Sequence, residues 1–533
     1  MTLRAQLPRS LKDWLCVFGP GAIMASLTIG TGELIFSSRG GALFGFHILF
    51  VFVLILVLKW GLVFATSRHM ILTGVHPYER MMDLPGPRGW VPILLLLMAA
   101  VCLPIWINFH SGVLGNLMSW VTGTGHLMHG AMDYLWAAAI LSATLVLSAA
   151  GGYALLEKIQ TIVVLAMVFC AGLTLILYNP DWIELLLGIV PQTLSYPDWV
   201  STKYPKIADH SVWIETTRYV GVIGGAGFDY LAYIGWLREK KWGVLPDRAT
   251  PAQLAVIAAD PNHEVRKWIT APLVDCTISF AMVALFSMVF VASGAMFLGP
   301  RELVPDEENM LNLQARFVTQ IHPWLLPLYL CGAFLTMLGT LYGTIEIACS
   351  LADEIVRSFD PQWTEAKANR LKRIVLAWCG TIALAMACYL AVRQASPQLA
   401  TASMTASVSP GAVAAERPLV PKPRLLLAIL TPVNLFTGVL SCGLICALVL
   451  WMDRRWLPAE LQPPVWLSGL NLISALIFIG LGVKGYWDTE NRLIAVSAII
   501  GLLVMSLLIA RVMVSQQNIH PIEPLASVGE QPS

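Results

Sequence analysis

GPGAIMASLTIGTGELIFSSRGGALFGF, residues 19–46, reads as a membrane helix that is broken in its middle. Apolar residues run up to Ile29, the segment GTGE at 30–33 interrupts them, and apolar residues then resume. Each glycine weakens a helix by about 1 kcal/mol relative to alanine, and a carboxylate at mid-membrane depth costs at least about 2.5–3.5 kcal/mol on insertion scales. A bilayer tolerates this combination only where the freed backbone faces protein or water. A broken first helix that carries an acid is typical of the substrate site of a secondary transporter.

The composition is that of an integral membrane protein. Of the 533 residues, 57% are hydrophobic and 13% are charged, whereas a soluble protein has roughly 25% charged residues. The net charge of +1 gives no electrostatic basis for binding nucleic acid. The ten cysteines form no C-x-x-C pair and are expected to be inert buried thiols. Because no Walker motif, catalytic triad or metalloprotease motif appears, we predict neither an enzyme nor a cofactor.

Windows of about 20 apolar residues predict about twelve membrane spans. They lie at 13–44 (broken), 46–68, 90–110, 132–150, 157–178, 212–237 (broken), 270–293, 323–348, 372–392, 425–452, 465–484 and 492–514. Lysine and arginine gather in alternate loops between these spans. By the positive-inside rule, both termini are then cytoplasmic in a multi-pass cell-membrane protein.

The spans divide the chain into two halves of five helices. We predict a cytoplasmic N-terminus (1–12), a first five-helix repeat (13–178), an outer loop (179–211), a second five-helix repeat (212–452), two additional transmembrane helices (453–514) and a cytoplasmic tail (515–533). Within these parts, we expect a short interfacial helix at 182–189 and a surface helix at 250–260. The Ala-, Ser- and Pro-rich segment 394–424 reads as a flexible outer loop.

The sixth span has an interruption similar to that of the first. Several glycines, the last of them Gly227, come just before Asp229. Glycines in membrane helices often serve only close packing, but an acid beside the glycines of both spans favours a substrate site. Interrupted helices at matching positions of two five-helix halves of opposite orientation predict an inverted repeat with its site at the midplane. The predicted helix breaks are at Gly30, Gly32, Gly224, Gly225 and Gly227.

The acids beside the breaks are the first candidates for a binding site. We predict that Glu33 and Asp229 face one cavity at mid-membrane depth, with the two breaks adjacent. Backbone and side chains near them complete the candidate substrate ligands, which are Gly30, Thr31, Gly227, Tyr230 and Tyr233.

Two further charged residues lie inside predicted spans. Lys59 is nine residues, or about 13 Å of helix, from Arg68, which is too deep for its stem to reach the interface easily. We expect Lys59 to be buried and paired with Glu33, Asp229 or Glu346, or else to face water. Glu346 is expected either at the interface or in a charge or proton relay with Lys59. The histidines at 110, 126 and 129 are expected on the surface of an outer loop.

The first span and the segments GALFGF and ILTG that follow it resemble the first two helices of the Nramp divalent-metal transporters. The likeness continues through GGYALLEKI, the sixth span and TLYGTIEIACSLADEIV, and so covers most of residues 13–455. The resemblance implies an all-α membrane protein of the LeuT type, with a 5+5 inverted repeat and two extra helices. It also implies a divalent cation as the transported substrate, usually moved together with protons.

The two motifs that carry metal binding in that family are altered here. The family's D-P-G-N falls on residues 30–33, where only Gly32 matches. Its M-P-H-N falls on 228–231 or one residue later, and in the second register Asp229 takes the place of the metal-binding Met. The family's glutamine in the tenth helix falls on Asn434, which joins the candidate ligands through the resemblance. The missing first-helix Asp and sixth-helix His remove groups to which the family's proton coupling is attributed.

We therefore predict a secondary active transporter of a divalent metal cation, with one alternative. Carboxylates, carbonyls and hydroxyls are hard ligands, which favour a hard ion such as Mg(II) or Mn(II) over Cd(II). Alternatively, the protein is a LeuT-fold carrier of a small organic solute, an amine or amino acid, with Tyr230 or Tyr233 packed against it. A scaffold would gain nothing from broken helices that carry acids. The expected partners are the lipid bilayer and a small cationic substrate, and no oligomeric state is predicted.

Overall fold

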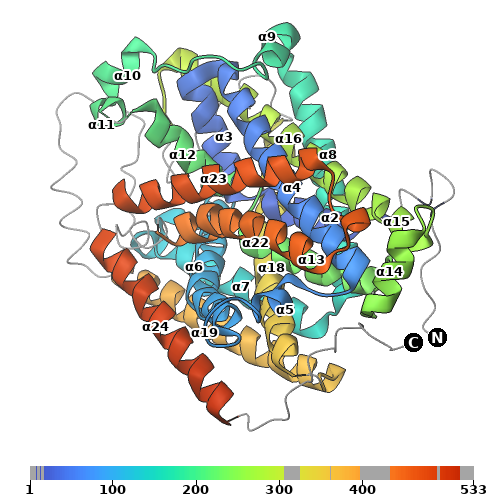
Figure 1. Ribbon diagram of the computed structural model, residues 1–533. Coiled ribbons are helices and arrows are strands. Elements are labelled where there is room, and N and C mark those ends of the chain that lie inside the picture. Colours follow the sequence, from blue (N-terminus) through green and yellow to red (C-terminus); the bar gives the residue numbers. More distant parts are fainter. Residues whose placement is uncertain are drawn as a thin grey trace, which may run out of the picture.

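The computed structural model describes residues 8, 13, 17–209, 211–245, 247–304, 325–360, 362–395, 432–488 and 492–516. The regular elements in these ranges are helices, which form one bundle (Figure 1). Eleven helical stretches in these ranges are long and apolar enough to cross a membrane. The remaining predicted span is the broken first one, which consists of two short helices, α2 (Pro20–Thr28) and α3 (Thr31–Phe44).

The first half of the chain follows the predicted order of spans. After α3 come η1 (Gly45–Ile48), α4 (Leu49–Thr73), α5 (Pro77–Met81), α6 (Trp90–Val121), η2 (Thr124–Gly130), α7 (Met132–Ala150) and α8 (Tyr153–Tyr178). The predicted outer loop holds three short helices, α9 (Trp182–Leu187), α10 (Asp198–Lys203) and α11 (Pro205–Ala208). Of these, α9 agrees with the short helix expected at 182–189.

The second half begins with the other broken span, which is formed by α12 (Val212–Val222) and α13 (Gly227–Lys240). It continues with α14 (Pro251–Ala259), α15 (Glu264–Lys267), α16 (Thr270–Ser293), η3 (Gly294–Leu298), η4 (Gly299–Arg301), α18 (Leu325–Phe359), α19 (Glu365–Ala395), η5 (Leu435–Leu440), α22 (Ser441–Trp456), η6 (Ala459–Leu461), α23 (Val465–Asp488) and α24 (Arg492–Gln516). The helix expected at 250–260 is α14. The predicted termini 1–12 and 515–533 and the loop 394–424 lie almost wholly outside the described residues.

The broken helices lie at the centre of the bundle. Every residue of α2 is buried, and α2 packs against α8, α13, α16 and α18. In turn, α3 packs on α16, and α13 packs on α4 and α18. By contrast, α24 lies at the edge of the bundle (Figure 1). The core is therefore built around the two interruptions, so the backbone freed there faces protein.

The expectations about His110 and about two of the cysteines need correction. His110 is not in an outer loop: it is buried in α6 and stacked on Trp106, with ring centroids 5.5 Å apart. The predicted span ended too early, because an apolar window ends where polar residues begin, whereas α6 continues to Val121 and buries several of those polar residues. His126 and His129 lie in η2 and are exposed, as expected. The nine described cysteines are free and most are buried, but Cys331 and Cys388 are exposed.

Candidate functional site

The two interruptions are short and lie next to each other. Ile29 and Gly30 separate α2 from α3, and residues 223–226 separate α12 from α13. Gly224 and Gly225 have φ angles of +82° and +94°, in a region that residues with a side chain rarely adopt. Two of the glycines predicted to break the sixth span, Gly224 and Gly225, therefore do so through their backbone angles. Of the other three predicted glycines, Gly30 lies in the first interruption, Gly32 lies in the first turn of α3, and Gly227 is the first residue of α13.

Substitution of Gly225 tests how tightly the breaks are packed. A Cβ atom at this position would lie 2.3 Å from Thr28 Cγ2 of α2 and 3.0 Å from Asp229 Oδ2. Together with the positive φ, this contact should make Gly225→Ala destabilising by at least about 2 kcal/mol. The control is Gly172→Ala in α8, where the new Cβ meets no atom within 4 Å. The measurement is the thermal unfolding midpoint of the two purified variants. Equal midpoints for Gly225→Ala and Gly172→Ala would contradict this close packing.

Each break is followed by an acid at the same helical position. Glu33 and Asp229 are the third residues of α3 and α13, where a negative charge interacts favourably with the helix dipole. The fully buried Glu33 binds the other break: its Oε1 accepts a hydrogen bond of 2.8 Å from the N–H of Gly224. Its Oε2 accepts bonds from Ser287 Oγ at 2.7 Å and Ser37 Oγ at 3.2 Å. The carboxylate of the first break thus ties α3 to the second break and to α16.

Asp229 holds the same segment from its other side. Its Oδ2 accepts a hydrogen bond of 2.7 Å from the N–H of Ala226 and so caps the start of α13. The residues that bind the two acids, Gly224 and Ala226, are only two positions apart, which the chain spans in at most about 7 Å. Adding the two hydrogen-bond lengths to this span puts the carboxylates of Glu33 and Asp229 within about 13 Å of each other.

Lys59 lies beside these acids but is bound differently from what we predicted. It is fully buried in α4, as expected. Its ammonium group, however, donates three hydrogen bonds to main-chain carbonyls, those of Val220 at 2.8 Å, Ile223 at 2.7 Å and Gly225 at 2.7 Å. The expectation of an acid as its bonded partner was wrong, because the broken end of α12 leaves carbonyl groups without partners inside the helix. Glu33 and Asp229 interact with the ammonium only electrostatically.

Glu346 is not part of this group. It is buried in α18, accepts a hydrogen bond of 2.5 Å from Ser148 Oγ, and forms an ion pair with Lys372 at 3.1 Å. Neither the predicted interface position nor a pairing with Lys59 is observed. The longer extent of α18 explains the difference, since the helix continues to Phe359 and carries Glu346 well inside it.

The two candidate tyrosines separate into different clusters. The hydroxyl of Tyr230 donates to the carbonyl of Gly224 at 2.5 Å, which places it at the second break. The hydroxyl of Tyr233 instead donates to Asp275 Oδ2 at 2.9 Å. Asp275 also accepts bonds from the N–H groups of Gly19 and Gly21 and so fixes the start of α2. The structure therefore does not bring Tyr233 to the breaks.

The other candidate ligands lie around the same centre. Asn434 precedes η5 and packs on α12, because a Cβ on Gly221 would lie 2.7 Å from Asn434 Nδ2. Gly30 packs on Thr340 of α18, with 2.7 Å between its added Cβ and Thr340 Oγ1. Gly227 packs still more closely on Ser441, because a Cβ added at Gly227 would lie 2.3 Å from Ser441 Oγ. The backbone of Thr31 starts α3, and its side chain lies outside what the structure describes.

Sequence reasoning missed the hydroxyl groups at the breaks. Ser37 and Ser287 bind Glu33, and Thr340 Oγ1 donates to the carbonyl of Ile29 at 3.3 Å. Their only signal is a polar residue in an apolar span. That signal is weak, because serine and threonine in helices usually bond to a carbonyl of their own preceding turn.

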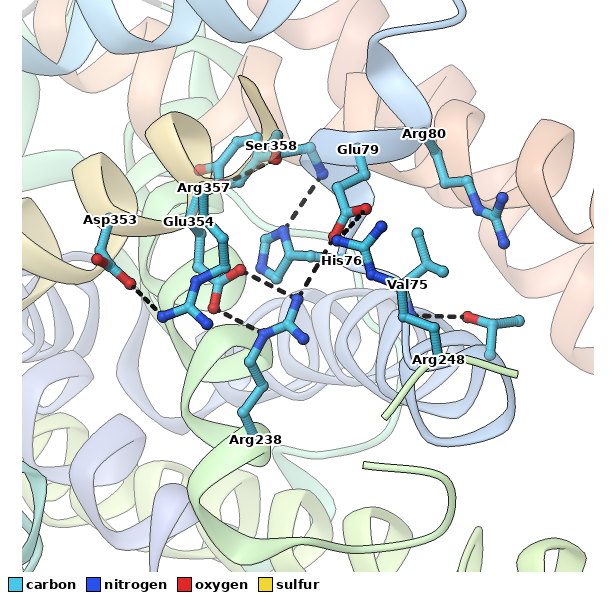
Figure 2. Close-up of polar contacts among 12 residues, drawn as sticks. Val75, His76, Glu79, Arg80, Arg238, Arg248, Asp353, Glu354, Arg357 and Ser358 are labelled. Atoms are coloured by element: carbon cyan, nitrogen blue, oxygen red, sulfur yellow. Dashed lines mark hydrogen bonds and ion pairs between the residues drawn. The ribbon is translucent and has the colours of Figure 1, made fainter. Parts of the chain in front are cut away.

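A second polar group, which we call the charged cluster, lies at one end of the bundle. It consists of Glu79 of α5, Arg238 of α13, Glu354 of α18 and Arg248 (Figure 2). Arg238 donates two hydrogen bonds to Glu354, at 3.0 and 3.3 Å, and lies 3.6 Å from Glu79. Arg248 pairs with Glu79 at 2.9 Å. The cluster joins the end of the broken helix α13 to α5 and α18.

His76 caps the start of α5, beside the charged cluster. Its burial should make the stability of the folded protein depend on pH. Its Nδ1 accepts a bond from the N–H of Tyr78, and its Nε2 lies 3.1 Å from the carbonyl of Leu231, a pattern that suits a neutral ring. Burial lowers the pKa of His76 from 6.5 to about 4. Because the folded pKa is depressed, the stabilisation is complete above pH 6.5 and is lost as the pH falls towards 4, by about 3 kcal/mol.

The test compares His76→Gln with His263→Gln by thermal unfolding between pH 7.5 and pH 4.5. His263 makes the same kind of cap, with Nδ1 accepting from Val265 N–H at 3.2 Å, but it is only partly buried. We expect His76→Gln to flatten the loss of stability on acidification and His263→Gln to leave it unchanged. Equal pH profiles for His76→Gln and the unmodified protein would contradict this account.

The opposite halves of the broken helices are joined by another buried ion pair. Arg39 of α3 binds Glu215 of α12 through Nε at 2.5 Å and Nη2 at 3.3 Å. Tyr219 and Arg218 donate further bonds to Glu215, at 3.1 and 3.5 Å. Both partners of the pair are buried. This contact fastens α3 to α12, as the charged cluster fastens α13 to α18.

Comparison with known proteins shows the fold. The sequence matches no family model, and no curated protein matches it significantly. The manganese transporter of Eremococcus coleocola, solved with an aromatic bis-isothiourea compound, superposes with a TM-score of 0.67 at 14% identity, over 97% of this chain and 98% of that one. A mutant of the same transporter gives a TM-score of 0.65 at 14% identity over the same shares. The chain is thus an integral multi-pass membrane protein with the LeuT-type fold predicted from its sequence.

Proposed function

We propose that this protein is a secondary active transporter that binds a small, positively charged substrate between its two helix breaks. The observation that carries the proposal is the pair of carboxylates, Glu33 and Asp229, bound to one four-residue break in the buried centre of the bundle. Transporters of other families place broken helices and acids in this way around a substrate site. A purely structural role would not require buried carboxylates, which are costly within a membrane.

The charges at the breaks favour a substrate with a single positive charge. When Glu33 and Asp229 are ionised and Lys59 is protonated, the three side chains carry two negative charges and one positive charge, which leaves one negative charge for a substrate to balance. A divalent ion would add an uncompensated charge beside the ammonium, and buried unbalanced charge is costly. Within the described residues, no three His, Cys, Asp or Glu side chains are grouped to hold a metal ion. A small organic cation, an amine or a basic amino acid, therefore fits this charge balance best.

A divalent metal ion is the second candidate, supported by the hard oxygen ligands and by the fold. Mg(II) and Mn(II) bind carboxylates and carbonyls, and Mg(II) usually keeps several waters. The superposed neighbour is named as a manganese transporter. For this candidate, Glu33 would have to exchange its bonds from Gly224 and Ser287 for the metal, and Lys59 would have to move away.

The ion pairs at the two ends suit alternating access. The charged cluster lies at the end that the positive-inside rule assigns to the cytoplasm and would close it through Arg238, Glu354 and Glu79. The pair of Arg39 with Glu215 would make α3 and α12 move together at the other end. Rigid movement of such units around a fixed central site is the usual mechanism of this class of carrier.

The experiment is uptake into liposomes that contain the purified protein. Labelled primary amines and amino acids are compared with Mg(II), Mn(II) and Cd(II), with and without an imposed proton gradient. We expect saturable uptake of an amine or a basic amino acid that the double variant Glu33→Gln, Asp229→Asn abolishes while it stays folded. Saturable uptake of Mg(II) or Mn(II) alone would select the second candidate. Uptake that is insensitive to both substitutions would refute the proposed site.

A further inference from the structure

The Lys59 ammonium group occupies a set of three carbonyl oxygens that could otherwise bind a free cation. Its three carbonyl acceptors come from the last turn of α12 and from the break itself, at 2.7 to 2.8 Å from Nζ. A protonated lysine has three N–H donors and no acceptor, so three carbonyl acceptors match the charged form. The side chain reaches this point from α4, which is a separate element, and is fully buried there.

The carbonyl groups alone would suit a free cation. The end of a helix carries partial negative charge and unpaired carbonyls, and unwound carbonyls at half-helix ends are ligands for monovalent ions in transporters. Here the carboxylates of Glu33 and Asp229 add negative charge nearby. No further cation can bind the same three oxygens while the ammonium occupies them.

We propose that Lys59 is a built-in cation that fills a latent monovalent-cation site at the broken end of α12. The protein therefore needs no free sodium or potassium ion to hold the break between α12 and α13. When the side chain is cut back, the same carbonyls take up a free monovalent ion or a small primary ammonium ion. This inference goes beyond the proposed transport function, because it concerns the carbonyls that Lys59 occupies and not the transported substrate.

Two variants of Lys59 distinguish the effect of an emptied cation site from the effect of losing the lysine charge. Lys59→Ala removes the ammonium and most of the stem, which leaves room for an ion at the carbonyls. Lys59→Met also removes the charge, but it fills the space of the stem and serves as the matched control. Each purified protein is unfolded thermally in sodium, potassium, ammonium, methylammonium or choline chloride at constant ionic strength.

We expect the unfolding midpoint of Lys59→Ala to rise saturably with at least one of the small cations relative to choline, because a ligand that binds only the folded state stabilises it. The unmodified protein and Lys59→Met should show no such rise. A folded Lys59→Ala that behaves alike in all five salts would overturn the proposal. A saturable sodium or potassium effect on the unmodified protein would overturn it as well.

If Lys59→Ala does not fold, the unmodified protein still provides the test. Its unfolding midpoint should be unchanged when sodium and potassium are fully replaced by choline, and a fall in that midpoint contradicts the built-in cation. These measurements need no transported substrate. Their failure would therefore leave the proposed transport function standing, and failure of the uptake experiment would leave the cation site standing.

Discussion

Glu33→Gln should lower substrate uptake by at least about a hundred-fold while the protein stays folded. At an effective dielectric constant of about 20, a carboxylate interacts with a positive charge 4 Å away by about 4 kcal/mol, and each 1.4 kcal/mol is a factor of about ten. The amide can keep the shape of the site. Its oxygen can accept from Gly224 N–H, and its NH₂ group can donate to the hydroxyls of Ser287 and Ser37, which rotate freely.

Comparison with two other variants identifies the cause of the loss. Glu33→Ala would leave the Gly224 N–H and the two serines without their acceptor, so it should also destabilise the fold by about 1–3 kcal/mol. Glu184→Gln, at an exposed acid of α9, should change neither uptake nor stability. Uptake by Glu33→Gln within about twofold of the unmodified protein would show that the charge of Glu33 plays no part in binding.

Glu354→Gln should open the end of the bundle that the charged cluster closes. Removing one partner of a buried ion pair costs about 3–5 kcal/mol, because Arg238 would keep only a neutral acceptor at position 354 beside the longer contact to Glu79, at 3.6 Å. If the pair exists only in the closed state, the open state should gain about 10²- to 10³-fold in relative population. Uptake should fall, because the carrier would rest open on one side.

The opening can be followed with a cysteine at position 350 in an otherwise cysteine-free protein. Ser350 lies in α18 on the side that faces α13, with its Oγ 3.2 Å from a Cβ placed on Gly235. Alkylation of Ser350→Cys should become about a hundred-fold faster with Glu354→Gln. Asp353→Asn is the control, since it breaks the neighbouring and more exposed pair with Arg357 and should contribute little. Equal alkylation rates for both variants would mean that the cluster does not hold this end closed.

The sequence was sufficient to predict the fold and the position of both breaks. Spans are marked by long apolar windows, and glycines beside Glu33 and Asp229 are visible in a single sequence because the membrane tolerates so few such residues. The partners of those residues could not be predicted. Lys59 binds carbonyl groups of residues about 160 positions away, and a carbonyl is present at every residue.

The same limit applies to the ion pairs between helices. No local pattern pairs Arg238 with Glu354, which are 116 positions apart, and only the packing of α13 against α18 shows that they meet. Glu346 was misplaced because its helix continues far beyond the apolar window. In each case the hydrogen-bond or ion-pair partner is distant in the sequence. A local pattern therefore shows that a charged residue lies inside an apolar span, but it does not show which group that residue contacts.

The most direct test of the central claim is a structure determined with the compound that proves to be transported. We predict density between the two breaks, in contact with the carboxylate of Asp229 and within reach of Glu33, with the Lys59 ammonium still on the carbonyls of Val220, Ile223 and Gly225. Density for the transported compound elsewhere in the bundle, with both breaks unchanged, would contradict the account.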